Sequence, residues 1–525
     1  MRLPLFSPAR QSAAQAPTQP TDAEGTPPRR ASNLLHSRLR WLFGPLLAVS
    51  MIVTGLGWVL ASPVGASPDD DYHLASIWCP RPVGESCETR VIDGEVNVRV
   101  PEPIAKASHC FAFQGEVSAA CTLPYLNENN GYTRRYDEGN YPKGYYRFHH
   151  LFVTDSVNQS VLMMRTANLL ISVVLLGAIA SLIPTLHRRA FAISLLVTWI
   201  PMGLYYVTSN NPSSWALTGT FAFAAAMFGS LSSTGMRRWL LLGLAALGAL
   251  LCITSRGDSA FFLFVVSMAL VFAVHWRRSH WPFILFLVIA SLVGISSMFS
   301  TGQSQIVASG DSEISFTPSG KLETFIRALL QVPRYIAGFY GYDRGPGWFD
   351  TPVNDPIVLV MLIVLGGALI VAIGGGSWRK WMSALMVFGA LLGVPILVTV
   401  RGFYPQLWNY QPRYMLPLFA VVLFVLFIVD SLNPAIFSRT QLLLIGMGVT
   451  FSHCLTLHRV LWRYTAGIVG GSEGPLNLNT FTQWWWPIPI SPEVVWGVSS
   501  VAFVGVVILA LVLSAPESEL NAKLS

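Results

Sequence analysis

Long apolar runs separated by short polar connections dominate the pattern of hydrophobic and polar positions along this 525-residue chain. A membrane-spanning helix needs about 17–25 predominantly apolar residues, and each run approaches that length. The predicted spans cover residues 41–62, 162–184, 190–207, 213–231, 238–254, 259–275, 281–298, 356–374, 381–400, 414–430, 440–456 and 493–514. The pattern therefore predicts an all-α polytopic membrane protein with about twelve transmembrane helices.

Basic residues between the runs indicate an orientation. Arg38 and Arg40 precede the first span, which favours a cytoplasmic N-terminus. This span is longer than the ~7–15 apolar residues of a signal peptide, so we expect it to be retained although residues 64–67 resemble a cleavage site. Every second connection after it is basic, with His187-Arg188-Arg189, Arg237-Arg238, Arg277-Arg278, Arg379-Lys380 and Arg439. The alternation predicts that both termini are cytoplasmic.

This orientation divides the chain into segments with different surroundings. The predicted segments are a disordered cytoplasmic N-terminus at 1–40, a first helix at 41–62, an extracytoplasmic loop at 63–160, a transmembrane core at 161–456 with an outer loop at 299–355, an extracytoplasmic segment at 457–492, a last helix at 493–514 and a cytoplasmic tail at 515–525. Residues 1–35 are rich in Pro, Ala, Ser, Thr and Gln and show no periodicity, which is the basis for the predicted disorder.

The outer loop at 299–355 contains an amphipathic pattern that starts near Thr317-Pro318. One predicted helix face carries Leu322, Phe325, Ile326, Leu329 and Leu330, and the other carries Lys321, Glu323 and Arg327. Such a helix either lies in the outer membrane interface or packs against the protein as an ordinary loop helix. The tryptophans at 484–486 predict an aromatic belt before the last span.

Composition supports a lipid environment for most of the chain. Hydrophobic residues make up 52% of the sequence and charged residues 12%, against about 25% charged in soluble domains. The formal charge of +7 is concentrated at helix ends, so it indicates orientation and not a nucleic-acid partner. No phosphate-binding glycine motif or nucleophile elbow is present, which leaves cytosolic nucleotide chemistry without support.

Four of the six cysteines lie in the first outer loop, at Cys79, Cys87, Cys110 and Cys121. Their spacings do not match a compact zinc site, because no CxxC occurs. We expect two disulfides in an oxidising compartment, with pairing between neighbours, 79 with 87 and 110 with 121, as the preferred connectivity.

The first candidate for chemistry is an acidic turn directly outside the first span, Ser67-Pro68-Asp69-Asp70-Asp71-Tyr72-His73. Three adjacent carboxylates repel one another, so the pKa of at least one can be raised enough for it to act as a base. A solvated acidic turn after a helix is the alternative. The turn lies at the membrane boundary, where a lipid-linked substrate would present its head group.

Further candidates lie in other outer turns. Arg413, followed by Tyr414, begins the tenth span. Placing a charged arginine near lipid costs free energy, so a partner is expected. A phosphate suits the planar guanidinium of arginine. A snorkelling side chain or an internal ion pair is the alternative reading. In Ser255-Arg256-Gly257-Asp258 we expect a local pair between Arg256 and Asp258. Asn210-Asn211 alone indicates an Asx turn.

No metal is predicted. His149 and His150 are adjacent, so their side chains diverge, and the sequence offers no evident third ligand.

Three of these motifs, in order, resemble a known family. Pro-Asp-Asp-Asp-Tyr-His after span one, Ser-Asn-Asn before span four and Gln-Pro-Arg-Tyr-Met-Leu-Pro at 411–417 resemble the bacterial membrane family called domain of unknown function 2142. The resemblance covers roughly residues 45–455. The chain differs in having Gln411-Pro412-Arg413-Tyr414 where the family more often shows Gly-Arg-Tyr, and in a longer first loop that carries cysteines.

That family resembles the GT-C glycosyltransferases, which take sugars from polyprenyl phosphates. The resemblance implies a bacterial plasma-membrane enzyme with an extracytoplasmic active face and a cell-envelope glycan or glycolipid as acceptor. It implies a catalytic aspartate among Asp69, Asp70 and Asp71, with Asp70 as the first choice. Arg413, Tyr414, Arg256, His73, Asn210 and Asn211 would bind substrate or phosphate. The donor would be a polyprenyl-phosphate sugar, and the resemblance leaves any divalent metal open.

Two other functions remain compatible with the sequence. A transporter or flippase predicts charged or broken helices at the bilayer midplane, whereas the predicted spans are almost uncharged inside and show no convincing internal repeat. A non-catalytic envelope assembly protein would use the disulfide-tied loop as a docking surface.

Overall fold

The computed structural model describes residues 29–125, 129–302, 320–430, 437–468, 474, 476–480 and 483–515. The chain divides into two units, residues 1–43 and 44–525, and the fold and site below belong to the second. The disorder predicted for residues 1–28 and most of the predicted tail lie outside the described residues. Helix α1 runs from Arg29 to Leu60, so it already begins within the stretch predicted to be disordered.

Within the described residues, nine helices are long and apolar enough to cross a membrane. They are α1 from Leu42, α6 (Val157–Leu182), α9 (Ser213–Leu231), α10 (Gly235–Ser255), α12 (Trp281–Ser300, preceded by the 3-10 turn η3, Arg278–His280), α15 (Asp355–Ile373), α16 (Trp378–Val400), α18 (Arg439–Thr465) and α19 (Pro492–Leu513). Two apolar helices are shorter, α11 (Gly257–Ala273) with 17 residues and α17 (Leu416–Ile428) with 13. By length and composition, the described part of the chain therefore has fewer than the twelve spans expected.

The span predicted at 190–207 consists of two helices, α7 (Thr185–Trp199) and α8 (Met202–Val207). Pro201 interrupts it, because proline lacks a backbone N–H and disfavours helical backbone in the preceding residue. Ile200 is accordingly extended. The apolar run is therefore broken, and α8 leads into the polar turn before α9.

Helices α9 and α17 form the centre of the helical core. The α9 span is 94% buried, against 28% for that of α12, and α17 is buried from Leu416 to Phe427. Glycines allow α9 and α10 to approach closely, since a Cβ on Gly219 would lie 2.6 Å from the carbonyl oxygen of Gly248. Peripheral helices expose large apolar side chains such as Leu292, as expected of surfaces that face lipid.

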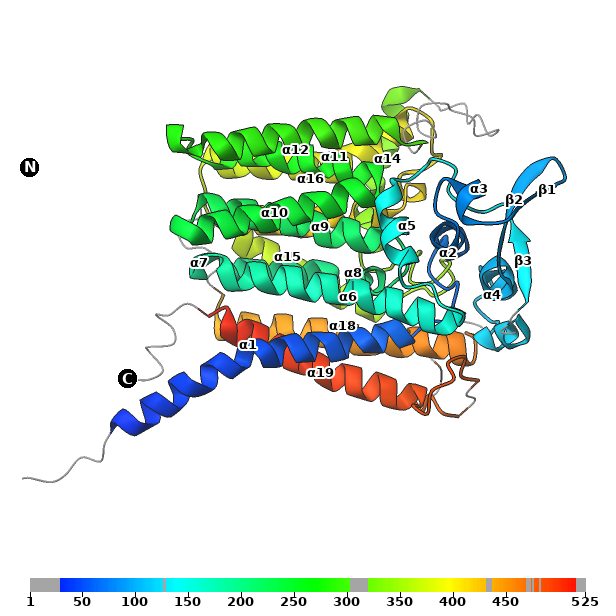
Figure 1. Cartoon of the computed structure of the whole chain (residues 1–525). Helices are drawn as coiled ribbons and strands as arrows, with labels where there is room; N and C mark the ends of the chain where they lie inside the picture. The colour runs from blue at the N-terminus through cyan, green and yellow to red at the C-terminus, as the bar shows by residue number, and fades with distance from the viewer. Residues whose placement is uncertain are drawn as a thin grey trace, which may run out of the picture. The chain divides into compact units, whose positions relative to one another are not determined.

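The chain between α1 and α6 forms a cap at one end of the helices (Figure 1). The cap consists of α2 (Asp70–Trp78), α3 (Val83–Ser86), β1 (Thr89–Ile92), β2 (Glu95–Pro101), α4 (Glu102–Lys106), the 3-10 turns η1 (Ala107–Cys110) and η2 (Ala119–Tyr125), β3 (Asn130–Thr133) and α5 (Lys143–His150). Its strands form an antiparallel sheet in the order β1-β2-β3, with Val98 opposite both Thr89 and Thr133.

This small sheet corrects the expectation of an all-α fold. The signal for it was present in Asp93-Gly94, a two-residue turn in which both residues have positive φ, at 52° and 81°. Asp-Gly between two strand-forming runs, the second with valines at alternate positions, is a strong indication of a hairpin. The chain is thus mostly helical with one extramembrane sheet.

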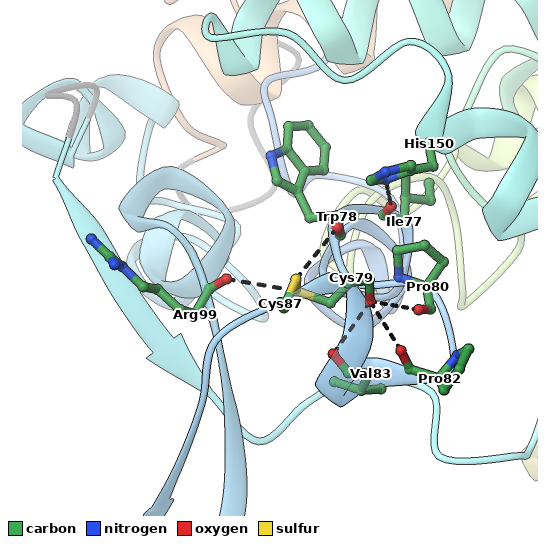
Figure 2. Close-up of a disulfide and its surroundings, with 10 residues drawn as sticks. Ile77, Trp78, Cys79, Pro80, Pro82, Val83, Cys87, Arg99 and His150 are labelled. Atoms are coloured by element: carbon green, nitrogen blue, oxygen red, sulfur yellow. Dashed lines mark hydrogen bonds between the residues drawn. A yellow bond between two sulfur atoms is a disulfide. The ribbon is translucent and has the colours of Figure 1, made fainter.

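Two disulfides tie the cap together, and they join the pairs that neighbour pairing predicts. Cys79 bonds to Cys87, and Cys110 bonds to Cys121. Figure 2 shows the first bond closing the chain between the end of α2 and the segment before β1. The His150 ring of α5 lies 2.9 Å, Nδ1 to oxygen, from the Ile77 carbonyl, so α5 also holds the end of α2 (Figure 2).

The predicted amphipathic helix corresponds to α14 (Lys321–Gly338); the predicted start at Thr317-Pro318 lies outside the described residues. Its predicted apolar face is exposed, with Leu322 at 73% and Leu330 at 77%. Tyr335, near its end, is buried. The first turns of α14 therefore do not bury their apolar side chains against the protein, which favours the interface interpretation over the packed loop helix.

Candidate functional site

The three aspartates of the acidic turn point in different directions because the backbone bends sharply at Asp69. Asp69 has φ 61°, in the left-handed region, and caps α2. Aspartate tolerates this conformation better than most residues. Asp70 and Asp71 occupy the first turn of α2, where the helix dipole favours negative charge. The turn thus gives the three carboxylates three different environments.

Asp70 is enclosed completely. Its Oδ2 accepts a hydrogen bond from the Ser67 backbone N–H at 3.2 Å and lies 3.7 Å from Nη2 of Arg165. Its Oδ1 has no hydrogen-bond partner among the described residues. Burial raises the pKa of Asp70 to about 6, and the Arg165 charge only partly opposes that rise.

Arg165, on α6, is 1% exposed and holds this part of the turn in place. Its guanidinium donates to the carbonyl oxygens of Val59, Ser62 and Pro63 at 3.0, 2.7 and 2.8 Å. Arg165 therefore binds the backbone at the end of α1 and also lies close enough to Asp70 to balance the charge of its carboxylate. Sequence reasoning missed Arg165, although an arginine at the edge of an apolar run is itself an indication of a buried partner.

Asp71 forms an ion pair with a second arginine, Arg135. Arg135 donates from Nε to Oδ2 at 2.5 Å and from Nη2 to Oδ1 at 3.2 Å, a two-point pair. The Asp71 side chain is 7% exposed. Arg135 was not predicted as a site residue.

Asp69 is the carboxylate of the three that faces outward. Its side chain is 41% exposed, and its Oδ2 lies 3.0 Å from Nη2 of Arg413. Arg135 lies 3.5 Å from the other oxygen. Burial of its surroundings raises the pKa of Asp69, but the charges of Arg413, His73 and Arg135 together outweigh it and leave the pKa below its usual value.

Arg413 lies in the 3-10 turn η5 (Pro412–Tyr414), immediately before α17. Its side chain is 7% exposed, and Nη2 also donates to the Tyr414 hydroxyl at 3.3 Å. Its Nε and Nη1 are buried and have no hydrogen-bond partner among the described residues. Buried guanidinium N–H groups without acceptors carry a desolvation cost, so this cation is suited to an anion from outside the chain.

Arg413 borders a small hollow of about 10 Å³, room for about one water molecule, between η5, α8 and the end of α14, which we call the Arg413 hollow. It is lined by Met202, Tyr206, Gly338, Phe339, Arg344, Phe349, Gln411, Pro412, Arg413 and Leu416. The lining includes the polar side chain of Gln411, whose Oε1 also has no partner among the described residues. Met202, Phe339 and Leu416 supply an apolar part. The hollow thus combines a cationic group with an apolar wall.

A second cation, Arg344, reaches the same hollow from the loop after α14. Its guanidinium lies 5.1 Å from the rings of Phe349 and of Trp408, which belongs to the 3-10 turn η4 (Leu407–Asn409). Asp350, in the same loop, is held by Arg463 at 2.9 Å, and both side chains are buried. The loop is therefore anchored beside the hollow. Sequence reasoning did not select Arg344, because nothing local separates it from a solvated arginine.

Arg256 and Tyr414 flank the acidic turn on another side. Arg256 pairs with Asp258 at 2.9 and 2.7 Å, which confirms the local pair predicted from the turn. Its guanidinium also lies 5.0 Å from the centre of the Tyr414 ring, and that of Arg413 lies 5.1 Å away. Tyr414 is thus in contact with two cations.

His73 and the asparagine turn lie behind the aspartates. His73 shares a hydrogen bond with the Tyr146 hydroxyl at 2.9 Å, and burial lowers the pKa of its ring to about 3. Asn211 donates to the Pro68 carbonyl oxygen at 3.0 Å, so the turn before α9 does reach the acidic turn. Asn210 is fully buried and has no side-chain partner among the described residues. Asn211 therefore holds the turn, and His73, Asn210 and Asn211 do not line the Arg413 hollow.

His149 and His150 do not converge. His149 bonds to Asn168 at 2.9 Å, whereas His150 faces Ile77. Among the described residues, no group of three or more His, Cys, Asp and Glu side chains is arranged to hold a metal ion.

The predicted residues therefore separate into two groups. Asp69, Arg413, Tyr414 and Arg256 lie at or beside the outward-facing part of the site. Asp70, Asp71, His73 and Asn211 are buried and hold the acidic turn, and Asn210 is buried beside them without a side-chain partner among the described residues.

No curated protein matches the chain. A family model described as "Predicted membrane protein (DUF2142)" matches residues 52–422, which include the acidic turn, the asparagine turn and Arg413. The match covers more than half of the chain. The chain therefore belongs to the family of predicted membrane proteins called domain of unknown function 2142.

Proposed function

We propose that this protein is a membrane glycosyltransferase that moves a sugar from a polyprenyl-phosphate donor to a cell-envelope glycan or lipid on the extracytoplasmic face. The observation that carries the proposal is the pair of Asp69 and Arg413. An outward-facing carboxylate lies 3.0 Å from a buried guanidinium with two unpartnered N–H groups, beside a hollow that is partly apolar.

In this proposal the general base is Asp69 and not Asp70. A base must reach the proton it removes, and Asp70 is fully buried whereas the Asp69 side chain is 41% exposed. The Asp69 carboxylate would take the proton of the acceptor hydroxyl while the oxygen of that hydroxyl bonds to the anomeric carbon of the donor sugar. The bond from that carbon to the phosphate oxygen breaks, and polyprenyl phosphate leaves with the electron pair.

Arg413 would stabilise the leaving phosphate. Its Nε and Nη1 can donate to phosphate oxygens, an interaction that strengthens as negative charge develops on the leaving group. Arg344 would add a second positive charge at the same hollow. The first part of the polyprenyl chain would lie along α14, whose exposed apolar face suits the outer membrane interface.

Donor binding would also raise the low pKa of Asp69, which a general base requires. The pKa of Asp69 is low partly because Arg413 is its ion-pair partner. A phosphate that binds Arg413 competes with this pair and offsets the guanidinium charge. The carboxylate then regains proton affinity when the donor is in place, which couples base strength to donor binding.

The first experiment uses undecaprenyl phosphate, the leaving group shared by donors that carry different sugars. The purified full-length protein should bind it, and Arg413→Gln should weaken binding about 10- to 100-fold, the range expected for lost charge-assisted hydrogen bonds. Arg134→Gln is the matched control, because Arg134 is a 72% exposed arginine of the cap that pairs with Glu95. Equal affinity in the wild type and Arg413→Gln would refute the phosphate assignment.

A further inference from the structure

A second cavity lies at the opposite end of the helical core from the cap. Helix α6 begins at Val157, next to the cap, and ends at Leu182, so residues near 182 are at the far end. The cavity has a volume of about 380 Å³ and is bounded by α1, α6, α7 and α19. It is separate from the Arg413 hollow, because the two share no lining residue. Its size is within the range of small-molecule and lipid sites.

The cavity is a cleft between helices that are built for a membrane. Three of its four walls, α1, α6 and α19, are long and apolar enough to span a bilayer. Apolar side chains from these walls, among them Met51, Val173 and Val506, line its length. This lining therefore suits a largely apolar ligand.

Small residues create the space. Gly44, Ala48, Gly177, Ala180, Ala192 and Ala510 all line the cavity. A Cβ on Gly177 would meet nothing within 4 Å, so this glycine faces open space and not a neighbouring helix. Between Val173 and Ser181 a helix rises on the order of 12 Å, enough for a large part of an acyl chain.

The polar lining is confined to one end. Ser181 precedes the end of α6, Arg188 is in the first turns of α7 and Ser514 caps α19. Arg188 donates from Nη2 to the Ser181 carbonyl oxygen at 2.9 Å, which holds its guanidinium at this mouth. Arg237, from α10, reaches the same end of α6 and donates to the Leu182 and Ile183 carbonyl oxygens. The apolar lining therefore ends at Arg188, and Arg237 lies at the same end of α6.

We infer that this cavity binds one acyl chain of an anionic phospholipid from the leaflet opposite the cap, with the lipid head group against Arg188. An apolar lining between membrane-spanning helices matches an acyl chain, and a basic side chain at its end matches a negatively charged head group. The site is independent of the proposed glycosyl transfer, since it shares no residue with that machinery.

The test is native mass spectrometry of the full-length protein in a nonionic detergent. The probes are dioleoyl phosphatidylglycerol, which is anionic, and dioleoyl phosphatidylcholine, which has the same chains and no net charge. We expect preferential retention of phosphatidylglycerol. Arg188→Gln should lower its retention about fivefold and leave phosphatidylcholine unchanged, as expected for one basic residue at an anionic lipid.

A second variant tests the apolar part of the cavity and leaves the charge of Arg188 unchanged. Gly177→Leu should reduce retention of both lipids by filling the cavity, and the open space at Gly177 allows the larger side chain to fit. Gly366→Leu is its control, because Gly366 on α15 also faces open space and does not line the cavity. Arg278→Gln is the control for charge, since Arg278 is exposed and outside the lining.

Some outcomes would overturn the site. Equal retention of the two lipids, or an unchanged preference in Arg188→Gln, would remove the head-group assignment. An equal loss in Gly366→Leu and Gly177→Leu would remove the cavity as the binding place. Dimeric mass in place of lipid adducts would assign the cleft to a second copy of the chain, against the inference.

Discussion

Two carboxylate–arginine pairs lie one residue apart in the acidic turn, and they differ in what surrounds them. Asp70 and Arg165 are 0% and 1% exposed, and Arg165 is bound to three backbone carbonyl oxygens. Asp69 is 41% exposed, and Arg413 keeps two N–H groups without a partner in the described part of the chain.

The difference indicates that the two pairs have different roles. A pair that is closed on all sides can position backbone but cannot exchange partners, whereas a pair with an open carboxylate and an incompletely bonded arginine can accept a ligand. The proposal therefore assigns Asp70–Arg165 to holding the turn and Asp69–Arg413 to chemistry.

The largest effect should come from the outward-facing carboxylate. Asp69→Asn should lower glycosyl transfer about 10²- to 10⁴-fold, the range for loss of a general base. Binding of undecaprenyl phosphate should not weaken, because the substitution removes a competitor for Arg413. The readouts are turnover in a membrane transfer assay and phosphate affinity.

The matched control is Asp93→Asn. Asp93 also has a positive φ and lies in the cap, in the hairpin turn before β2, so it reproduces the change in chemistry and backbone context. If Asp93→Asn and Asp69→Asn lose the same activity, the role of Asp69 as base is wrong.

Breaking the closed pair should affect stability. Arg165→Met leaves the buried Asp70 carboxylate unpaired and removes hydrogen bonds from three carbonyl groups, which should cost about 3–5 kcal/mol of unfolding free energy. The midpoint of denaturant unfolding in detergent measures it. Adding Asp70→Asn should recover part of the loss, and a double variant no more stable than Arg165→Met would argue against the charge pair as the cause.

The closed pair should also make stability depend on pH. Burial raises the pKa of Asp70 from 3.8 to about 6, so the folded state binds the proton more tightly than the unfolded state. Its contribution to stability is fully present below pH 3.8 and is lost as the pH rises through about 6. The full difference is roughly 3 kcal/mol.

This contribution is isolated by comparing the wild type with Asp70→Asn. Burial lowers the pKa of His73 to about 3, so His73 stabilises the fold above pH 6.5 and loses that contribution as the pH falls toward 3 in both proteins. The difference between the two unfolding curves should therefore change between pH 4 and 6. A difference that is flat over this window contradicts the proposed state of Asp70.

The smallest effect concerns the cystine that closes the far end of α2. Cys79→Ser combined with Cys87→Ser should lower the unfolding free energy by about 2–3 kcal/mol, as expected for a short disulfide loop. Undecaprenyl phosphate affinity should be retained, since Asp69 and Arg413 are held by other contacts. A loss of affinity as large as that of Arg413→Gln would show that the open pair depends on the cystine and not on the closed pair.

Much of the architecture could be predicted from local sequence. The predicted span 213–231 has the bounds of α9, and most other apolar runs coincide with helices to within a few residues. Pro201 was the exception, because the hydrophobic pattern of that run does not record a broken backbone. The hairpin at Asp93-Gly94 carries a local signal as well, because both turn residues are of types that tolerate positive φ.

The candidate site was only partly predictable. The acidic turn and Arg413 stand out because charged residues beside apolar runs are rare. Arg135, Arg165 and Arg344 could not be ranked above other arginines, since each derives its role from partners far away in the chain. Arg413 and Asp69, for example, are 344 residues apart.

By itself the sequence determined that this is a membrane protein of its family, where most of its helices lie, which cysteines neighbour one another and which turn carries three carboxylates. Hydrophobic periodicity and local motifs depend on near neighbours, and these are written directly in the chain. Only the tertiary structure decided which carboxylate is outward-facing and which is enclosed. Adjacent aspartates are chemically identical until the left-handed backbone at Asp69 and two distant arginines place them in different surroundings.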